Sequence, residues 1–132
     1  MRIFRIAPVA LLMLAGCNGP ATYATQAVTV FHQRLDAADY EAIWRDSGPD
    51  LRAATSRAAF VAMLDSLHDR LGKVRATKQT GWNSQVNTAG SLAELTHQTT
   101  FERGSGEETF VYKGSGEGLK LAGYNIQSDA LR

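Results

Sequence analysis

The spacing of apolar positions along this chain changes once, at Gly72. Before that residue, apolar side chains recur every three or four positions, which is the period of a helix with one buried face. After it, apolar and polar residues alternate, as they do along a strand of a half-buried sheet. A run of helices followed by a run of strands is typical of an α+β domain, so this is the fold class that we expect.

Three helices are predicted before Gly72, and they cover residues 26–35, 38–45 and about 56–71. The third has the clearest signal, because Thr55 or Ser56 can cap its first turn and Gly72 can adopt the left-handed conformation that ends it. Its apolar stripe consists of Phe60, Met63, Leu64, Leu67 and Leu71. Residues 47–50, Ser-Gly-Pro-Asp, are predicted to form a turn.

Four strands are predicted after Gly72, and they cover residues 73–85, 91–103, 107–113 and 118–127. Residues 87–90, Asn-Thr-Ala-Gly, are typical of a hairpin connection between the first two strands. The motif Gly-Ser-Gly-Glu occurs at residues 104–107 and again at 114–117, each time between two strands. A phosphate-binding loop would lead into a helix, so we interpret both motifs as hairpin turns in an antiparallel meander.

Residues 1–16 have the features of an export signal. Arg2 and Arg5 begin it, and the apolar run that follows is too short to span a bilayer, which takes roughly 20 residues. The run ends in Leu14-Ala15-Gly16-Cys17, which has the form of a bacterial lipobox. Small residues let the backbone enter a peptidase groove, and the Cys17 thiol accepts the lipid. An ordinary signal peptide with a chance cysteine, or a cytoplasmic amphipathic segment, is the alternative.

Cleavage before Cys17 would leave a lipidated tether at residues 17–25, a single α+β domain at 26–128 and a tail at 129–132. Asn18 stands where an Asp commonly retains a lipoprotein in the inner membrane, so we expect attachment to the outer membrane, facing the periplasm. Two or three acyl chains make such attachment stable. The tether from Asn18 to Thr25 would reach at most roughly 28 Å if extended.

The composition excludes several functions. Without Arg2 and Arg5, 12 basic residues remain against 13 acidic ones, so the formal charge of the mature chain is −1. A nearly neutral domain is a poor binder of nucleic acids, whose phosphates attract basic surfaces. Cys17 is the one cysteine, so its lipidation leaves no thiol for disulfides or catalysis. We expect no cofactor, and the spacing of the histidines suggests no metal site.

Three segments of the chain resemble a bacterial family of unknown function, number 4019. They are Tyr-Glu-Ala-Ile-Trp at residues 40–44, Leu-Gly-Lys-Val at 71–74 and Gly-Leu-Lys-Leu-Ala-Gly-Tyr-Asn-Ile at 118–126. The resemblance extends roughly from Thr25 to Ser128. It implies the architecture of the nuclear transport factor 2-like superfamily, in which a curved sheet wraps N-terminal helices into a cone. The shared residues are packing motifs, and the family brings no known catalytic residues.

His97 is the candidate catalytic residue. Alternation places it on the mostly apolar face of the second strand, and enzymes of the superfamily hold an acid or a base inside the cone. The alternative is a core histidine satisfied by one hydrogen bond. His68 lies at the edge of the third helix's stripe, and His32 is expected to face solvent. Glu107 and Glu108 are expected to point to opposite faces of their strand.

Aromatic residues are the candidates for contact with a ligand or a partner. Trp44 and Tyr124 are expected to pack in the core, and Tyr112 shares a strand face with Phe110. Trp82 lies in a weakly apolar strand segment. If it is exposed it marks a contact surface, because a large apolar ring is costly to leave in water.

These observations favour a lipid-anchored envelope protein with a non-catalytic role, the binding of a small apolar ligand or of another envelope protein. A cone-fold isomerase or dehydratase that uses His97 as its base is the second hypothesis. An open cavity that reaches His97 would support it, and a closed core would not. Homodimerisation through the open face of the sheet is the third hypothesis.

Overall fold

The computed structural model describes residues 20–88 and 90–132. Its helices are α1 (Pro20–Asp36), α2 (Tyr40–Arg45), α3 (Pro49–Ala54) and α4 (Arg57–Leu71), with short 3₁₀ turns η1 (Gly116–Gly118) and η2 (Asp129–Leu131). Its strands are β1 (Val74–Asn87), β2 (Gly90–Phe101), β3 (Gly104–Lys113) and β4 (Lys120–Gln127). The predicted export signal and the predicted lipidation site, Cys17, lie outside the described residues. None of the described helices is long and apolar enough to cross a membrane.

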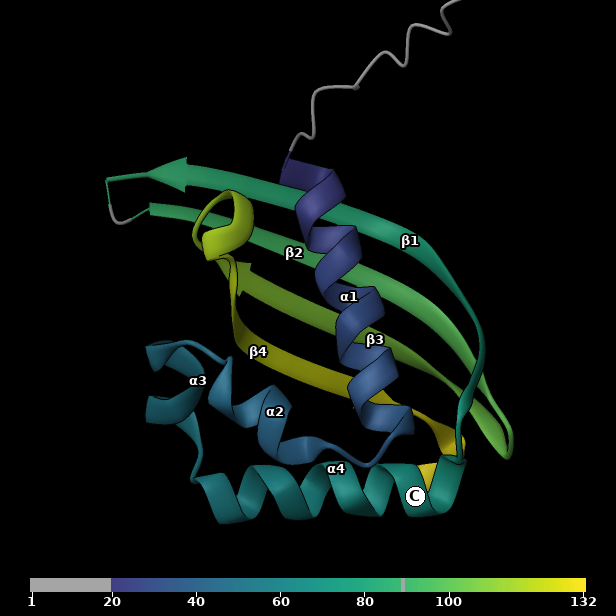
Figure 1. Cartoon of the computed structure of the whole chain (residues 1–132). Coiled ribbons are helices and arrows are strands. Elements are labelled where there is room, and N and C mark those ends of the chain that lie inside the picture. Colours follow the sequence, from purple (N-terminus) through teal and green to yellow (C-terminus); the bar gives the residue numbers. More distant parts are fainter. Residues whose placement is uncertain (1–19, 89) are drawn as a thin grey trace, which may run out of the picture.

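The four strands form one open antiparallel sheet in the order β1-β2-β3-β4, as expected for a meander. The sheet curves, and α1 runs across one of its faces (Figure 1). The shorter α2 and α3 lie with α4 on the side of β4, away from β1 (Figure 1). The prediction of an α+β domain with N-terminal helices and a four-stranded antiparallel sheet is therefore confirmed.

Helix α4 is bounded by the two residues that its sequence predicts. The Ser56 hydroxyl accepts a hydrogen bond from the Ala59 amide at 3.1 Å, and Gly72 ends the helix with a φ of 76°. Phe60, Leu64, Leu67 and Leu71 are buried along one face. Met63, which we expected in the same stripe, is 40% exposed, because it lies one position away from Leu64 and faces outward.

The core includes buried residues of all four helices and of the sheet, and α1 contributes a central part of it. Four side chains of α1 point toward the strands and are buried, namely Ala24, Val28, Phe31 and Leu35. They meet the buried residues Ala93, Leu95, Phe110, Tyr112 and Leu121, which alternation places on the inner face of the sheet. Burial of each large apolar side chain contributes about 1.5–3 kcal/mol, so this contact holds the helix on the sheet.

Three local predictions are corrected. Helix α1 begins at Pro20 and includes residues 20–25, which we assigned to the tether. Residues 49–54 form helix α3, because Pro49 occupies the first position of a helix, where its missing amide hydrogen costs nothing. The first Gly-Ser-Gly-Glu motif begins β3 at Gly104 and is not a turn, whereas the second, at residues 114–117, does connect β3 to β4.

Candidate functional site

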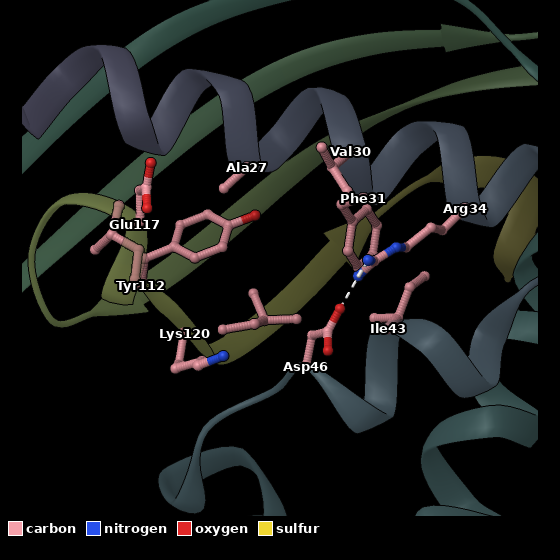
Figure 2. A pocket seen from close by; sticks show the side chains of 11 residues that line it. Ala27, Val30, Phe31, Arg34, Ile43, Asp46, Tyr112, Glu117 and Lys120 are labelled. Carbon is pink, nitrogen blue, oxygen red and sulfur yellow. Dashed lines mark ion pairs between the residues drawn. The ribbon is translucent and has the colours of Figure 1, made fainter. Parts of the chain in front are cut away.

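A pocket of about 400 Å³ opens between α1, α2 and the β3–η1–β4 segment. Its apolar wall comes from both layers of the fold and includes Ala27, Phe31, Ile43, Leu119 and Leu121. Of the α1 residues that line it, Phe31 belongs to the buried face of the helix, and Ala27, Val30 and Arg34 lie beside that face (Figure 2). This volume falls in the range of pockets that hold small molecules, roughly 300–1,000 Å³.

The charged residues that line the pocket carry equal numbers of positive and negative charges. Arg34 and Asp46 form an ion pair with an Nη2–Oδ2 distance of 2.7 Å on one side (Figure 2). Glu117 and Lys120 provide one charge of each sign on the other. The lining therefore carries no net formal charge, so it favours a neutral or zwitterionic ligand over a strongly charged one.

Tyr112 provides a hydrogen-bond donor inside the pocket. Its ring is buried, and Figure 2 shows the hydroxyl pointing into the space below Ala27. Burial, together with the negative charge of Glu108, raises the pKa of Tyr112 well above its usual value. The phenol is therefore protonated at every physiological pH and can donate to an oxygen or nitrogen acceptor on a ligand.

A buried carboxylate, Glu108, lies on the same inner face of β3 as Tyr112 but beyond Phe110. It is 0% exposed, and three groups contact its oxygens. His32 Nε2 on α1 lies 2.8 Å from Oε1, and the Thr99 hydroxyl on β2 donates to the same oxygen at 2.5 Å. The Tyr124 hydroxyl on β4 donates to Oε2 at 2.6 Å. A carboxylate only accepts, so the His32 nitrogen that faces it carries a hydrogen.

The network continues from Thr99 to β1. The Thr77 and Thr99 hydroxyl oxygens are 2.8 Å apart, and Thr77 Oγ1 is 3.1 Å from His97 Nδ1. Because Thr99 gives its only hydrogen to Glu108, Thr77 must donate to Thr99 and His97 must donate through Nδ1. The other ring nitrogen, Nε2, then carries a lone pair, and it is buried without a hydrogen-bond partner. We define the Glu108 network as Glu108, His32, Thr99, Tyr124, Thr77 and His97.

The pKa values agree with this direction of hydrogen bonding. Burial alone would raise the pKa of Glu108, but the hydrogen bond and charge of His32, with those of Thr99 and Tyr124, hold it below its usual value. Burial, and then the proximity of His32, lower the pKa of His97 in spite of Glu108. Glu108 is therefore ionised and His97 neutral at pH 7.

The four candidate residues from the sequence fall in four separate places. Tyr112 lines the pocket, whereas His97 does not, since it is 4% exposed and packs edge-on against Phe110 at a ring distance of 5.7 Å. Trp44 is half-buried against Phe60, and the Arg52 guanidinium lies 5.6 Å from the centre of its ring. Trp82 is 38% exposed on β1, so it meets the condition that we set for a contact surface.

Two residues have a part in the site that their local sequence did not indicate. His32 was expected at the surface, but it is only 6% exposed because it follows Val28 by four positions on the buried face of α1. Glu108 was placed correctly on the face opposite Glu107, although nothing local marked it as the centre of a network. The described residues contain no group of three His, Cys, Asp or Glu side chains that could hold a metal ion.

Fold and site together define a single α+β domain with a small open pocket and a separate, closed polar network. The chain belongs to the family described as protein of unknown function DUF4019, whose model matches residues 27–124. The family segments that we recognised in the sequence include the closing strand β4 and the start of α2. No curated protein and no solved structure matches the chain.

Proposed function

We propose that this chain is a lipid-anchored protein of the bacterial envelope whose domain binds a small, mainly apolar ligand. The pocket between α1 and β4 carries the proposal, because it combines an apolar wall with the hydroxyl donor of the buried Tyr112. A ligand of this class would place an apolar body against Phe31 and Leu121 and a carbonyl or ether oxygen near the phenol.

The fold supports a wider relationship that we also propose. Helices that precede a curved antiparallel sheet have the element order of the nuclear transport factor 2-like superfamily, and a cavity beside the first helix suits such an architecture. The lipobox at residues 14–17 supports export and attachment through Cys17, to the outer membrane by the argument from Asn18.

The geometry supports a non-catalytic role better than the enzyme hypothesis. His97 is buried and packs edge-on against Phe110, and its Nε2 atom is buried without a hydrogen-bond partner among the described residues. A substrate would have to displace core side chains to reach it, and such displacement is costly in a close-packed interior.

Filling the pocket is expected to weaken ligand binding. In an Ala27→Phe variant, a phenyl ring would occupy the space above the Tyr112 hydroxyl. We expect the affinity for the neutral apolar probe N-phenyl-1-naphthylamine to fall about tenfold or more, as measured by fluorescence titration. Ala27 is only half-buried, so the domain should tolerate the larger side chain.

An Ala62→Phe variant provides the matched control, because Ala62 is exposed on α4 and does not line the pocket. It should bind the probe as the unmodified domain does. Equal probe affinity in all three proteins, with matching melting temperatures, would show that the probe binds elsewhere and would remove the support for this pocket.

Lipid attachment gives a separate expectation. Mass spectrometry of the mature protein should find an N-terminus at Cys17 that carries two or three acyl chains, and a Cys17→Ala protein should lack them and leave the membrane fraction. An unmodified Cys17 in a membrane-associated chain would contradict the anchor, whatever the pocket binds.

A further inference from the structure

Strand β1 is an edge strand of unusual length. It has 14 residues, and among the described residues only β2 pairs with it as a strand, so no strand covers its other side. At its first residue, the Val74 amide donates to Asp36 on α1. Strands in globular proteins usually have 3–10 residues. The open edge of a strand presents unpaired amides and carbonyls, which are a ready template for pairing with another chain.

The two halves of β1 differ in how they protect that edge. Residues 74–79 contain Arg75 and Lys78, and one register shift lies within them while a second follows Gln79. Charged residues and irregular pairing both discourage edge pairing. Residues 80–87, Thr-Gly-Trp-Asn-Ser-Gln-Val-Asn, contain no charged residue and no proline. We call residues 80–87 the neutral segment. It pairs regularly with β2 from Gly81 onward.

The hydrogen bond between the Gly114 amide and the Ser91 carbonyl shows which backbone groups face the open edge. At 3.0 Å, this bond directs the Ser91 carbonyl toward β3 and so away from β1. Carbonyl directions alternate along a strand, so those of Ala93 and Leu95 also point toward β3. The β1 partners of these residues must therefore direct their own amides and carbonyls to the open edge. They are Val86, Ser84 and Trp82.

The same three residues share one face of the sheet. Trp82 pairs with Leu95, which is buried under α1, so the face is the one that α1 partly covers. Trp82 is 38% exposed and Val86 is 80% exposed. Both are thus large apolar side chains at an open edge, separated by the small Ser84.

We propose that the neutral segment pairs antiparallel with the neutral segment of a second copy of this chain, about a two-fold axis at Ser84. Ser84 then lies opposite the second copy's Ser84, and Trp82 lies opposite the second copy's Val86. All edge-facing backbone groups of the three residues find partners, which makes about six hydrogen bonds across the axis.

We chose this register because the side chains of the neutral segment then face suitable side chains of the second copy. Each aromatic ring meets a β-branched side chain on the same face, which is a favourable cross-strand pair. Asn83 and Gln85 meet each other on the opposite face, and Arg75 and Lys78 fall beyond the end of the paired segment. If the pairing between the two copies were shifted by one residue, the edge-facing amides would lie opposite backbone groups that are already bonded to β2. Trp82 would also no longer lie opposite the second copy's Val86. The axis is perpendicular to the sheet, so both copies carry α1 on the same side.

Cysteine cross-linking of the full-length chain in intact bacteria tests whether the two copies pair about an axis at Ser84. In a Ser84→Cys variant the two Cα atoms would lie about 5.5 Å apart, within the range that a disulfide spans. Oxidation with copper phenanthroline should give a band of doubled mass on a non-reducing gel. The unmodified chain measures any background from Cys17.

The neighbouring positions serve as matched controls. An Asn83→Cys chain alone, or a Gln85→Cys chain alone, would place its two thiols about 8 Å apart between Cα atoms, too far for a disulfide. Co-expression of these two variants should restore the cross-link, because Asn83 and Gln85 are opposite each other in the proposed register. Equal cross-linking by all single variants would show random collision and overturn the proposal, as would no cross-link for Ser84→Cys.

A second substitution tests the backbone pairing itself. The Val86 amide faces the open edge, so Val86→Pro removes no bond to β2 and leaves the monomer fold intact. Combined with Ser84→Cys, it should reduce the disulfide band about tenfold relative to Ser84→Cys alone. An undiminished band would overturn pairing through the edge, and cross-linking to a different protein would show that the edge has another partner.

Discussion

Replacing Glu108 with alanine is expected to lower the free energy of unfolding by about 3–5 kcal/mol. The change would leave the donors of His32, Thr99 and Tyr124 without an acceptor in a site that is fully buried. Each buried unsatisfied donor costs about 1–3 kcal/mol, and the loss of side-chain volume adds a cavity. Urea unfolding followed by circular dichroism measures the difference.

Glu107 is the matched control, since it is the adjacent carboxylate and is exposed on the other face of β3. A Glu107→Ala protein should lie within about 0.5 kcal/mol of the parent. Glu108→Gln should fall between the two, because its carbonyl oxygen can still accept from His32 and Thr99. A loss below about 1 kcal/mol for Glu108→Ala would show that the Glu108 network does not hold α1 on the sheet.

Acidification below pH 6.5 is expected to destabilise the domain in two stages. His97 has a pKa below 6.5 in the folded chain and an ordinary one when unfolded, so the unfolded chain binds more protons between the two values. Lower pH therefore favours unfolding throughout that window. The second stage begins below pH 4.5, the ordinary pKa of a glutamate. Glu108 has a lower pKa in the folded chain, so the stability that its ionised form contributes is lost as the pH falls from 4.5 through that folded pKa.

Melting temperatures measured between pH 8 and pH 3.5 check this expectation. The melting temperature should decline below pH 6.5 and then more steeply below pH 4.5. A His97→Gln protein should lose the first decline, because an amide can donate to Thr77 but does not titrate. If the variant and the parent declined equally between pH 6.5 and pH 5, a group other than His97 would be responsible.

Much of the fold could be predicted because the apolar period reports directly on secondary structure. The change of period at Gly72 separates helices from strands, and the cap residues Ser56 and Gly72 lie where α4 begins and ends. The prediction of a turn at residues 47–50 failed because proline is common both after the end of a helix and at its first position. Pro49 can end a helix or begin one, and only its tertiary surroundings show that it begins α3.

The candidate site could be predicted far less well. His32 and Glu108 are 76 residues apart, and no local pattern reveals that they meet. Alternation did place Glu107 and Glu108 on opposite faces of their strand, but a carboxylate is stable on the buried face only because α1 and three other strands supply donors or neighbours. The pocket depends on the separation of α1 from β4, which is a property of packing and not of any one segment.

The early start of α1 bears on how neighbouring copies would meet. Only Asn18 and Gly19 stand between Cys17 and Pro20, the first residue of the helix, and two residues reach at most about 7 Å. A chain lipidated at Cys17 would hold its domain close to the headgroups. All copies would then lie in one thin layer above the bilayer. Confinement to a plane raises their effective concentration, so an edge contact too weak to persist in dilute solution would still be populated on the membrane.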